Sequence, residues 1–238
     1  MAGDRYDMGR LSFALRPATG TPGERDEPLG LDSGRDGVLY VPETAGPAAP
    51  LLVFLHGAAG TGRAHLRAVL GAVDRYGVVL VAPDSRGPTW DLIVERRFGP
   101  DVAFLDRVLD AVVDRVDADA QRVAIGGVSD GASYALSIGL TNGDVLSAVL
   151  AFSPGFLVAP NLTGKPRIFI SHGRSDPILP IDACSRSFVP GLRGAGYEVN
   201  FREFDGGHTV PPPIADDAVR WWLDGARSSA ERMGVPPS

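Results

Sequence analysis

Short apolar runs alternate along this chain with longer segments whose apolar residues recur at helical spacing. The runs, each bounded by Gly, Pro or a polar residue, are PLLVFLHG, VVLVAP, RVAIGG, LSAVLAFSPG and PRIFISHG. A continuous apolar run of this length is typical of a strand buried on both faces. The segment DVAFLDRVLDAVVDRV, with apolar residues spaced from Val102 to Val116, has the pattern of an amphipathic helix. The alternation predicts an α/β fold with a mainly parallel sheet and helices on both faces.

Further elements are predicted towards the two ends of the chain. LSFALR, residues 11–16, alternates in period two and predicts a first strand, followed by a Gly/Pro-rich loop up to about residue 37. Residues 38–41 and the segment EVNFREFDGGH predict two more strands. The predicted helices are RAHLRAVLGAVDRYG, ending at Gly77, ASYALSIGLTNG, CSRSFVPGLRGAG, which Pro190 can break, and IADDAVRWWLDGARSSAERM. Residues 1–238 are therefore expected to form a single domain, with a disordered tail from about residue 230.

One Gly-rich turn in this pattern carries a candidate nucleophile. Gly127–Gly131, GVSDG, matches G-x-S-x-G, a pattern that a chain with 30 glycines can also contain by chance. Here it follows a predicted strand and opens a predicted helix, which is the placement of a nucleophile elbow. Small flanking residues permit the sharp turn, and the helix N-terminus aims N–H groups at a developing negative charge. We predict that Ser129 is the nucleophile; a plain Gly-rich turn is the alternative.

A serine nucleophile needs a base, and the chain has four histidines. His208, in FDGGHTVPPP, follows the last predicted strand, so its loop is expected beside the elbow. His56 ends a strand but lies in a different loop, and His65 is expected at the surface. His172, in ISHGRSD, is expected to hold the neighbouring loop. His208 is therefore the predicted base, and a solvated loop histidine is the alternative.

The base needs a carboxylate to orient it and to stabilise the imidazolium. Asp176, in SHGRSDPILP, follows the strand PRIFI and precedes a turn. Asp182 and Asp205 are the competing carboxylates, but Asp182 is expected in the next helix and Asp205 lies only three residues from His208. Asp176 is therefore the predicted acid, and an exposed loop carboxylate is the alternative. Serine, acid and base then occur in the chain order Ser129, Asp176, His208, each after a predicted strand.

The same reaction requires two N–H donors for the oxyanion. The residue after the nucleophile, Asp130, is expected to supply one. The second donor is expected from the loop His56–Gly60, HGAAG, with Ala58 preferred and Ala59 possible. The alternative is a Gly-rich loop that only begins a helix.

With these motifs the sequence resembles the α/β-hydrolase superfamily, and within it the small lidless bacterial esterases of the phospholipase/carboxylesterase, polyhydroxybutyrate-depolymerase and dienelactone-hydrolase groups. The resemblance covers about residues 38–223 and implies an eight-stranded sheet whose second strand is antiparallel. The elbow departs from the G-F-S-Q-G of carboxylesterases, because Asp130 places a carboxylate beside the nucleophile. Dienelactone hydrolases use cysteine there, so Ser129 argues against that activity, and Cys184 matches no catalytic motif.

The substrate side of the site is expected to be open. Only about ten residues separate AFSPG from PRIFI, which leaves no room for a cap domain. Trp90, Ile178 and Leu179 are candidate apolar walls of the pocket, with a place in the core as the alternative.

The composition limits the kinds of partner that this protein is expected to bind. A net charge of −6 and a pI of about 5.2 give no reason to expect a nucleic-acid or membrane partner. No apolar run reaches the roughly 20 residues of a membrane span, and no signal-like segment is seen, so a cytoplasmic location is expected. Metal-binding and dinucleotide motifs are not found, and no cofactor or metal is expected. The sequence does not indicate the oligomeric state.

These observations predict a serine hydrolase that cleaves carboxylic esters of short to medium acyl chains through an acyl-enzyme at Ser129. A thioesterase or a peptidase would use the same three residues. A non-catalytic binding protein with this fold is the third alternative.

Overall fold

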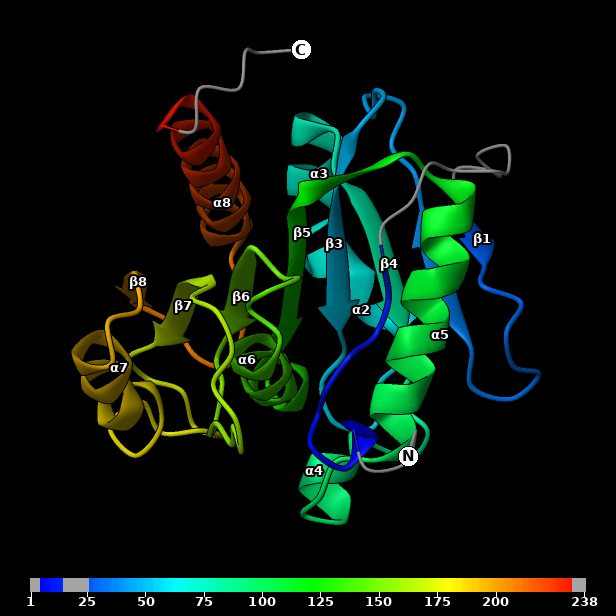
Figure 1. Ribbon diagram of the computed structural model, residues 1–238. Coiled ribbons are helices and arrows are strands. Elements are labelled where there is room, and N and C mark those ends of the chain that lie inside the picture. Colours follow the sequence, from blue (N-terminus) through cyan, green and yellow to red (C-terminus); the bar gives the residue numbers. More distant parts are fainter. Residues whose placement is uncertain (1–4, 15–25, 233–238) are drawn as a thin grey trace.

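Eight strands form one twisted sheet in the computed structural model, which describes residues 5–14 and 26–232 (Figure 1). Their order in the sheet is β1-β2-β4-β3-β5-β6-β7-β8. β2 is antiparallel to β1 and β4, and all other neighbours are parallel, as the resemblance implied. The strands are β1 (Asp26–Pro28), β2 (Gly37–Tyr40), β3 (Ala49–Leu55), β4 (Val79–Pro83), β5 (Ala118–Val128), β6 (Ala148–Phe152), β7 (Arg167–Gly173) and β8 (Val199–Phe204).

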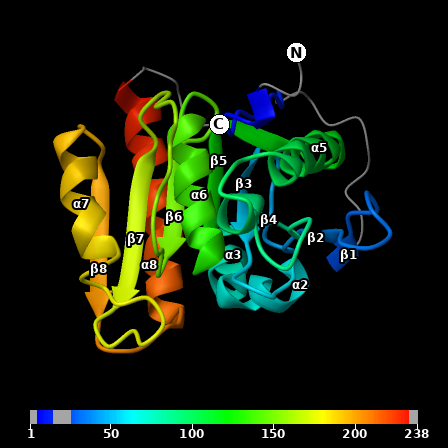
Figure 2. The same ribbon diagram turned by 90° about the horizontal axis from the view of Figure 1, so that it is seen from below.

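Helices cover both faces of this sheet (Figures 1 and 2). α5, α6 and α7 pack on one face, and the short helices that follow β3 pack with α8 on the other. The helical segments are α2 (Gly62–His65), the 3-10 turn η1 (Leu66–Ala68), α3 (Leu70–Tyr76), α4 (Asp91–Val94), α5 (Pro100–Arg115), α6 (Asp130–Thr141), α7 (Ser185–Gly194) and α8 (Pro212–Arg232). The expected α/β fold is therefore confirmed.

Strand β3 shows why the central runs are apolar throughout. Leu51, Val53 and Leu55 point into the core under α5 and α6, whereas Leu52 and Phe54 point into the core under α3 and α8. Side chains alternate across a strand, so a strand between two helical layers must be apolar on both faces. All seven residues of β3 are buried.

The segment LSFALR does not form the expected first strand. Residues 11–14 have no strand pairing, and residues 15 and 16 lie outside the described residues. The Leu11 N–H donates to the side-chain oxygen of Asn142, and the Phe13 N–H to Asp106, at 2.9 and 3.0 Å. Both side chains are buried, so the alternation correctly indicated a buried face. It could not indicate that side chains rather than a strand would satisfy the backbone.

Three helix predictions differ in detail from the structure. The segment before Gly77 is divided into α2, η1 and α3, although it ends at Gly77 in the left-handed conformation (φ 66°) as expected. Pro190 stands inside α7 without ending it. α8 extends to Arg232, and residues 233–238, most of the tail expected from about residue 230, lie outside the described part. No helix in the described ranges is long and apolar enough to cross a membrane.

The sheet brings the candidate residues together at its carboxyl edge, the side on which the parallel strands end. β3 to β8 are mutually parallel, so their carboxyl ends lie on the same side of the molecule. The loops after β3, β5, β7 and β8 carry Ala58, Ser129, Asp176 and His208 respectively. Ligands of open α/β sheets bind beyond the carboxyl ends of the strands.

Candidate active site

Ser129 occupies a strained turn between β5 and α6. Its backbone has φ 58° and ψ −120°, a conformation that costs a non-glycine residue roughly 1–3 kcal/mol. The Ser129 N–H donates to the Phe152 carbonyl on β6 at 2.9 Å, and the Ser129 carbonyl accepts the Ala132 N–H in the first turn of α6 at 3.0 Å. The turn is thus held from the neighbouring strand and from the helix.

The two glycines of GVSDG are required by close backbone contacts. A Cβ atom on Gly127 would lie 2.5 Å from the carbonyl carbon of Gly131. A Cβ on Gly131 would lie 2.5 Å from the His56 carbonyl oxygen and closer still to that of Leu55. Real Cβ contacts are essentially never below 3.0 Å, so any larger residue would push β5, α6 and the end of β3 apart. These contacts favour an elbow over an ordinary Gly-rich turn.

Asp176 and His208 form a hydrogen-bonded pair at the same edge of the sheet. The His208 Nδ1 lies 2.6 Å from Asp176 Oδ2, and the other carboxylate oxygen accepts the N–H groups of Ile178 and Leu179, both at 2.9 Å. Burial acts to raise the pKa of the Asp176 carboxyl. The donors from Leu179, His208 and Ile178 outweigh it and hold that pKa below its ordinary value. The pair has the geometry of an acid that orients a base.

The competing carboxylates lie elsewhere. The side chain of Asp182 is 82% exposed and pairs with Arg186, whereas that of Asp205 is 90% exposed and pairs with Arg174. Asp176 is buried and bonded to His208. Burial and partner together separate the three candidates.

The other histidines hold loops. His172 is fully buried, with Nδ1 2.7 Å from Ser185 Oγ and Nε2 2.8 Å from the Leu179 carbonyl oxygen and 3.3 Å from Asp176 Oδ2. It supports the loop that carries the acid, as expected. Its pKa is lowered by burial, because a charged imidazole loses hydration there.

His56 fixes the start of the loop HGAAG from inside the protein. Its Nε2 accepts the Ser85 N–H at 3.0 Å, which leaves the proton on Nδ1 to be donated to the Gly57 carbonyl at 2.7 Å. Burial lowers its pKa, because a charged imidazole loses hydration there. His65, expected at the surface, is half-buried, and a Cβ on Gly60 would clash with its ring.

The structure distinguishes the two candidate donors of that loop. The Ala59 N–H already donates to the Pro88 carbonyl at 2.8 Å. The N–H groups of Ala58 and Asp130 have no hydrogen-bond partner within the described part of the chain. A Cβ on Gly57 would lie 3.4 Å from Ser129 Cβ, so the loop faces the elbow directly. Ala58 and Asp130 are therefore the better placed pair of donors.

Ser129 and His208 are not hydrogen-bonded to each other in this structure. Among residues 5–14 and 26–232, the Ser129 hydroxyl makes no hydrogen bond, while His208 is held by Asp176. Catalytic hydrogen bonds are often long in ligand-free enzymes and shorten when substrate binds. The acid–base half of the arrangement is therefore formed, and the serine lies in an adjoining loop.

Trp90 does not line a pocket. It is completely buried, its indole N–H donates to the His56 carbonyl at 2.9 Å, and its ring stacks on Tyr134 with 5.1 Å between centroids. The side chain therefore holds the start of the loop HGAAG from the protein interior. By contrast, Ile178 is 64% exposed and Leu179 is half-buried, both next to Asp176.

No cap is inserted between β6 and β7 in the part of the chain that the structure describes. β6 ends at Phe152 and β7 begins at Arg167, and the described chain between them contains no helix or strand of the sheet. In the described ranges, no group of three His, Cys, Asp or Glu residues is placed to hold a metal ion.

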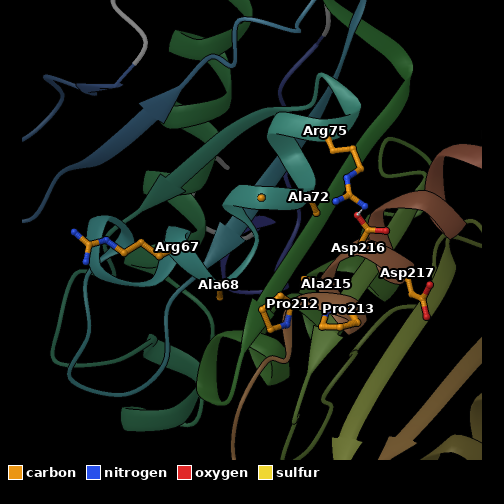
Figure 3. A pocket seen from close by; sticks show the side chains of 10 residues that line it. Arg67, Ala68, Ala72, Arg75, Pro212, Pro213, Ala215, Asp216 and Asp217 are labelled. Carbon is orange, nitrogen blue, oxygen red and sulfur yellow. Dashed lines mark ion pairs between the residues drawn. The ribbon is translucent and has the colours of Figure 1, made fainter.

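A cavity of about 570 Å³ lies apart from these residues, between α3 and the start of α8 (Figure 3). Arg75 and Asp216 form an ion pair of 2.8 Å across it. Pro212 and Pro213 open α8 without N–H groups, so the helix N-terminus gives an anion few donors. None of Ser129, Asp176 and His208 lines this cavity.

Comparison with known protein families shows which family this chain belongs to. The model of the phospholipase/carboxylesterase family matches residues 96–216, just over half of the chain, including Ser129, Asp176 and His208. The chain belongs to this family. A protein named "probable feruloyl esterase C" from Aspergillus oryzae is 28% identical over 172 residues, which cover 59% of this chain and 62% of that protein. Acyl-protein thioesterase 1 from Gibberella zeae is 26% identical over 228 residues, covering 79% and 94%.

Solved structures agree on the fold. The Bacillus cereus carboxylesterase superposes with a TM-score of 0.63 at 19% identity, covering 82% of this chain and 96% of that one. The S-formylglutathione hydrolase from Staphylococcus aureus gives 0.70 at 15% identity, covering 87% and 99%. At these identities the likeness shows a shared fold, and the chemistry must be argued from the site.

Proposed function

We propose that this member of the family is a serine hydrolase that cleaves carboxylic esters of short to medium acyl chains. The observation that carries the proposal is the Asp176–His208 pair at 2.6 Å, at the sheet edge that also carries the Ser129 elbow. The family match and the esterases among the relatives support the same chemistry. We take the substrate to be a small-molecule ester, by analogy with the esterases among the relatives, and the short connection between β6 and β7 leaves the site open to small or exposed esters.

In the proposed reaction, Ser129 Oγ attacks the ester carbonyl while His208 Nε2 takes its proton. The negative charge that forms on the carbonyl oxygen is accepted by the N–H groups of Ala58 and Asp130. Asp176 holds the His208 ring through Nδ1 and stabilises the imidazolium. The C–O bond to the alcohol then breaks, and the departing oxygen takes the proton from His208.

The acyl-enzyme is released by the same groups in reverse. His208 removes a proton from water, which attacks the acyl carbonyl, and Ser129 leaves with that proton restored to its oxygen. Ile178 and Leu179, beside Asp176, would contact the apolar part of the ester. Their exposure fits an open site that admits short and medium acyl chains.

Thioester hydrolysis is the second candidate function. The thioesterase from Gibberella zeae matches this chain over 94% of its own length, more than the feruloyl esterase does. The same serine, base and donors would act, with a thiolate as the leaving group in place of an alkoxide. An amide substrate, as in a peptidase, demands protonation of a poorer leaving group by the same His208.

The test compares the wild type with Ser129→Ala on p-nitrophenyl esters from acetate to palmitate, on an acyl thioester and on an amide. We expect ester turnover to fall by roughly 10⁴-fold or more in the variant. Ser187→Ala, on the exposed side of α7, is the matched control and should retain wild-type turnover. Equal activity of wild type and Ser129→Ala would refute the mechanism, and a wild type inactive on all three substrate classes would refute the function. Preference for the thioester would select the second candidate.

A further inference from the structure

Three consecutive residues in the loop between β4 and α4 hold both sides of the proposed oxyanion hole. The Pro88 carbonyl accepts the Ala59 N–H at 2.8 Å, and the Trp90 indole N–H donates to the His56 carbonyl at 2.9 Å. Between them, the Thr89 hydroxyl donates to Asp130 Oδ2 at 2.7 Å. Pro88 and Trp90 thus hold the two ends of the stretch that contains Ala58, and Thr89 holds the residue after the nucleophile.

This loop is fixed by the core. Trp90 is completely buried and stacks on Tyr134 of α6. The carboxylate of the next residue, Asp91, accepts the Tyr134 hydroxyl at 2.9 Å. The backbone N–H groups of Asp91 and Asp101, at the start of α5, each donate to the other's carboxylate, at 2.6 and 2.9 Å. The Thr89 hydroxyl is therefore presented to Asp130 from a rigid support.

Asp130 has its carboxylate where it is unfavourable for the negative charge of the proposed reaction. Its backbone N–H is a proposed oxyanion donor, and its carboxylate lies on the first residue of α6. The N-terminus of a helix attracts negative charge, because its first N–H groups have no partner within the helix. A freely rotating Asp130 carboxylate would be drawn to these N–H groups and would oppose a second negative charge there.

We propose that Thr89 is a positioning residue that prevents this competition. Its hydroxyl holds the Asp130 carboxylate against the loop between β4 and α4, which leaves the Asp130 N–H at the start of α6 available to the substrate oxygen. The inference rests on the proposed function, because it concerns the donors of that reaction. It predicts that the loss of the hydroxyl impairs the transition state more than the binding of the ester.

The experiment compares kcat and KM on a p-nitrophenyl ester for the wild type, Thr89→Val and Thr89→Ser. Removal of the groups that hydrogen-bond metal ligands typically costs about 10- to 100-fold in activity, and by analogy we expect a loss of that order in kcat for Thr89→Val with KM nearly unchanged. Thr89→Ser keeps the hydroxyl and should restore most of kcat. Thr44→Val is the matched control, because Thr44 donates to Asp74 at the opposite edge of the sheet.

A double variant separates charge competition from simple damage to the loop. In Thr89→Val/Asp130→Asn the freed side chain is neutral, so it should regain most of the kcat that Thr89→Val loses. Affinity for a trifluoromethyl ketone, which forms a tetrahedral adduct on an active serine, should fall and recover in parallel. Thermal unfolding checks that each variant is folded, and Thr89→Ala replaces Thr89→Val if valine proves unstable.

The outcomes distinguish the inference from the function it rests on. Wild-type kcat in Thr89→Val overturns the inference and leaves the esterase function intact. A loss that the double variant does not recover also overturns it, because that result indicates a structural role. An inactive wild type overturns both.

Discussion

Substituting Gly131 by alanine should both destabilise the protein and abolish most of its activity. The new Cβ would lie 2.5 Å from the His56 carbonyl oxygen and closer to that of Leu55. The backbones must therefore separate by about 0.5 Å at His56, and by more at Leu55, to reach 3.0 Å, below which real Cβ contacts are essentially never seen. Overpacking of this kind costs roughly 1–3 kcal/mol. For a chain of this size, about 2 kcal/mol corresponds to a fall in Tm of roughly 4–8 °C.

The same substitution should also lower kcat, beyond any loss of activity that partial unfolding would cause. Gly131 follows Asp130 directly, and the clashing oxygens belong to Leu55 and His56, which lead into Ala58. A displacement of ~1 Å between reacting groups can cost 10²-fold in rate, so we expect kcat to fall by about that factor at a temperature where the variant is fully folded.

Gly71→Ala in α3 is the matched control for Gly131→Ala. A Cβ at Gly71 meets no atom within 4 Å, and alanine is a better helix former than glycine by roughly 0.5–1 kcal/mol. It should therefore raise Tm slightly and leave kcat unchanged. Differential scanning calorimetry and initial rates on a p-nitrophenyl ester measure both properties. A Gly131→Ala protein with wild-type Tm and kcat would show that the close approach at the elbow is not required.

Three further predictions concern the acid loop. Asp176→Asn should lower kcat by about 10⁴-fold, as loss of the acid does in serine hydrolases. Asp205→Asn, at an exposed position, should leave kcat unchanged. A comparable loss in both variants would contradict the assignment of Asp176 as the acid. The pKa of His172 is lowered by burial, so only the unfolded state takes up its proton as pH falls below about 6.5, and stability should decline from there. Urea unfolding at pH 7 and pH 5 should show a smaller decline for His172→Gln, and an equal decline would contradict the assignment. Ile178→Ser should raise KM for octanoate more than for acetate with little change in kcat, whereas an equal effect on both esters would place Ile178 outside the acyl site.

Much of the fold was readable from local patterns, for a physical reason. A strand between two helical layers must be apolar on both faces, and this made the runs around Leu51–Leu55 and Val79–Pro83 recognisable. The same pattern misled at Leu11 and Phe13, whose alternation indicates a buried face but does not distinguish a strand from a segment bonded to Asp106 and Asn142.

The candidate site residues also differ in how far the sequence alone identifies them. Ser129 could be chosen from the sequence because a tight turn between a strand and a helix demands glycines at fixed positions. The positions of the predicted elements favoured Asp176 over Asp182 and Asp205, whereas its burial and its bond to His208 are visible only in the structure. The sequence leaves Trp90 open between a pocket wall and the core, because an aromatic residue in a loop gives no sign of the neighbours it will have; the structure places it in the core.

The sequence by itself determined the alternation of strands and helices, the strained turn at Ser129 and the order of the three predicted catalytic residues, since each depends on residues close in the chain. Only the tertiary structure decided that Ala59 is already bonded to Pro88, that Trp90 is buried beneath His56, and that Thr89 reaches Asp130. These contacts join β3, the loop after β4 and α6, which are distant in sequence. They form because the parallel sheet brings the carboxyl ends of its strands to one edge, and no local pattern encodes which side chains meet there.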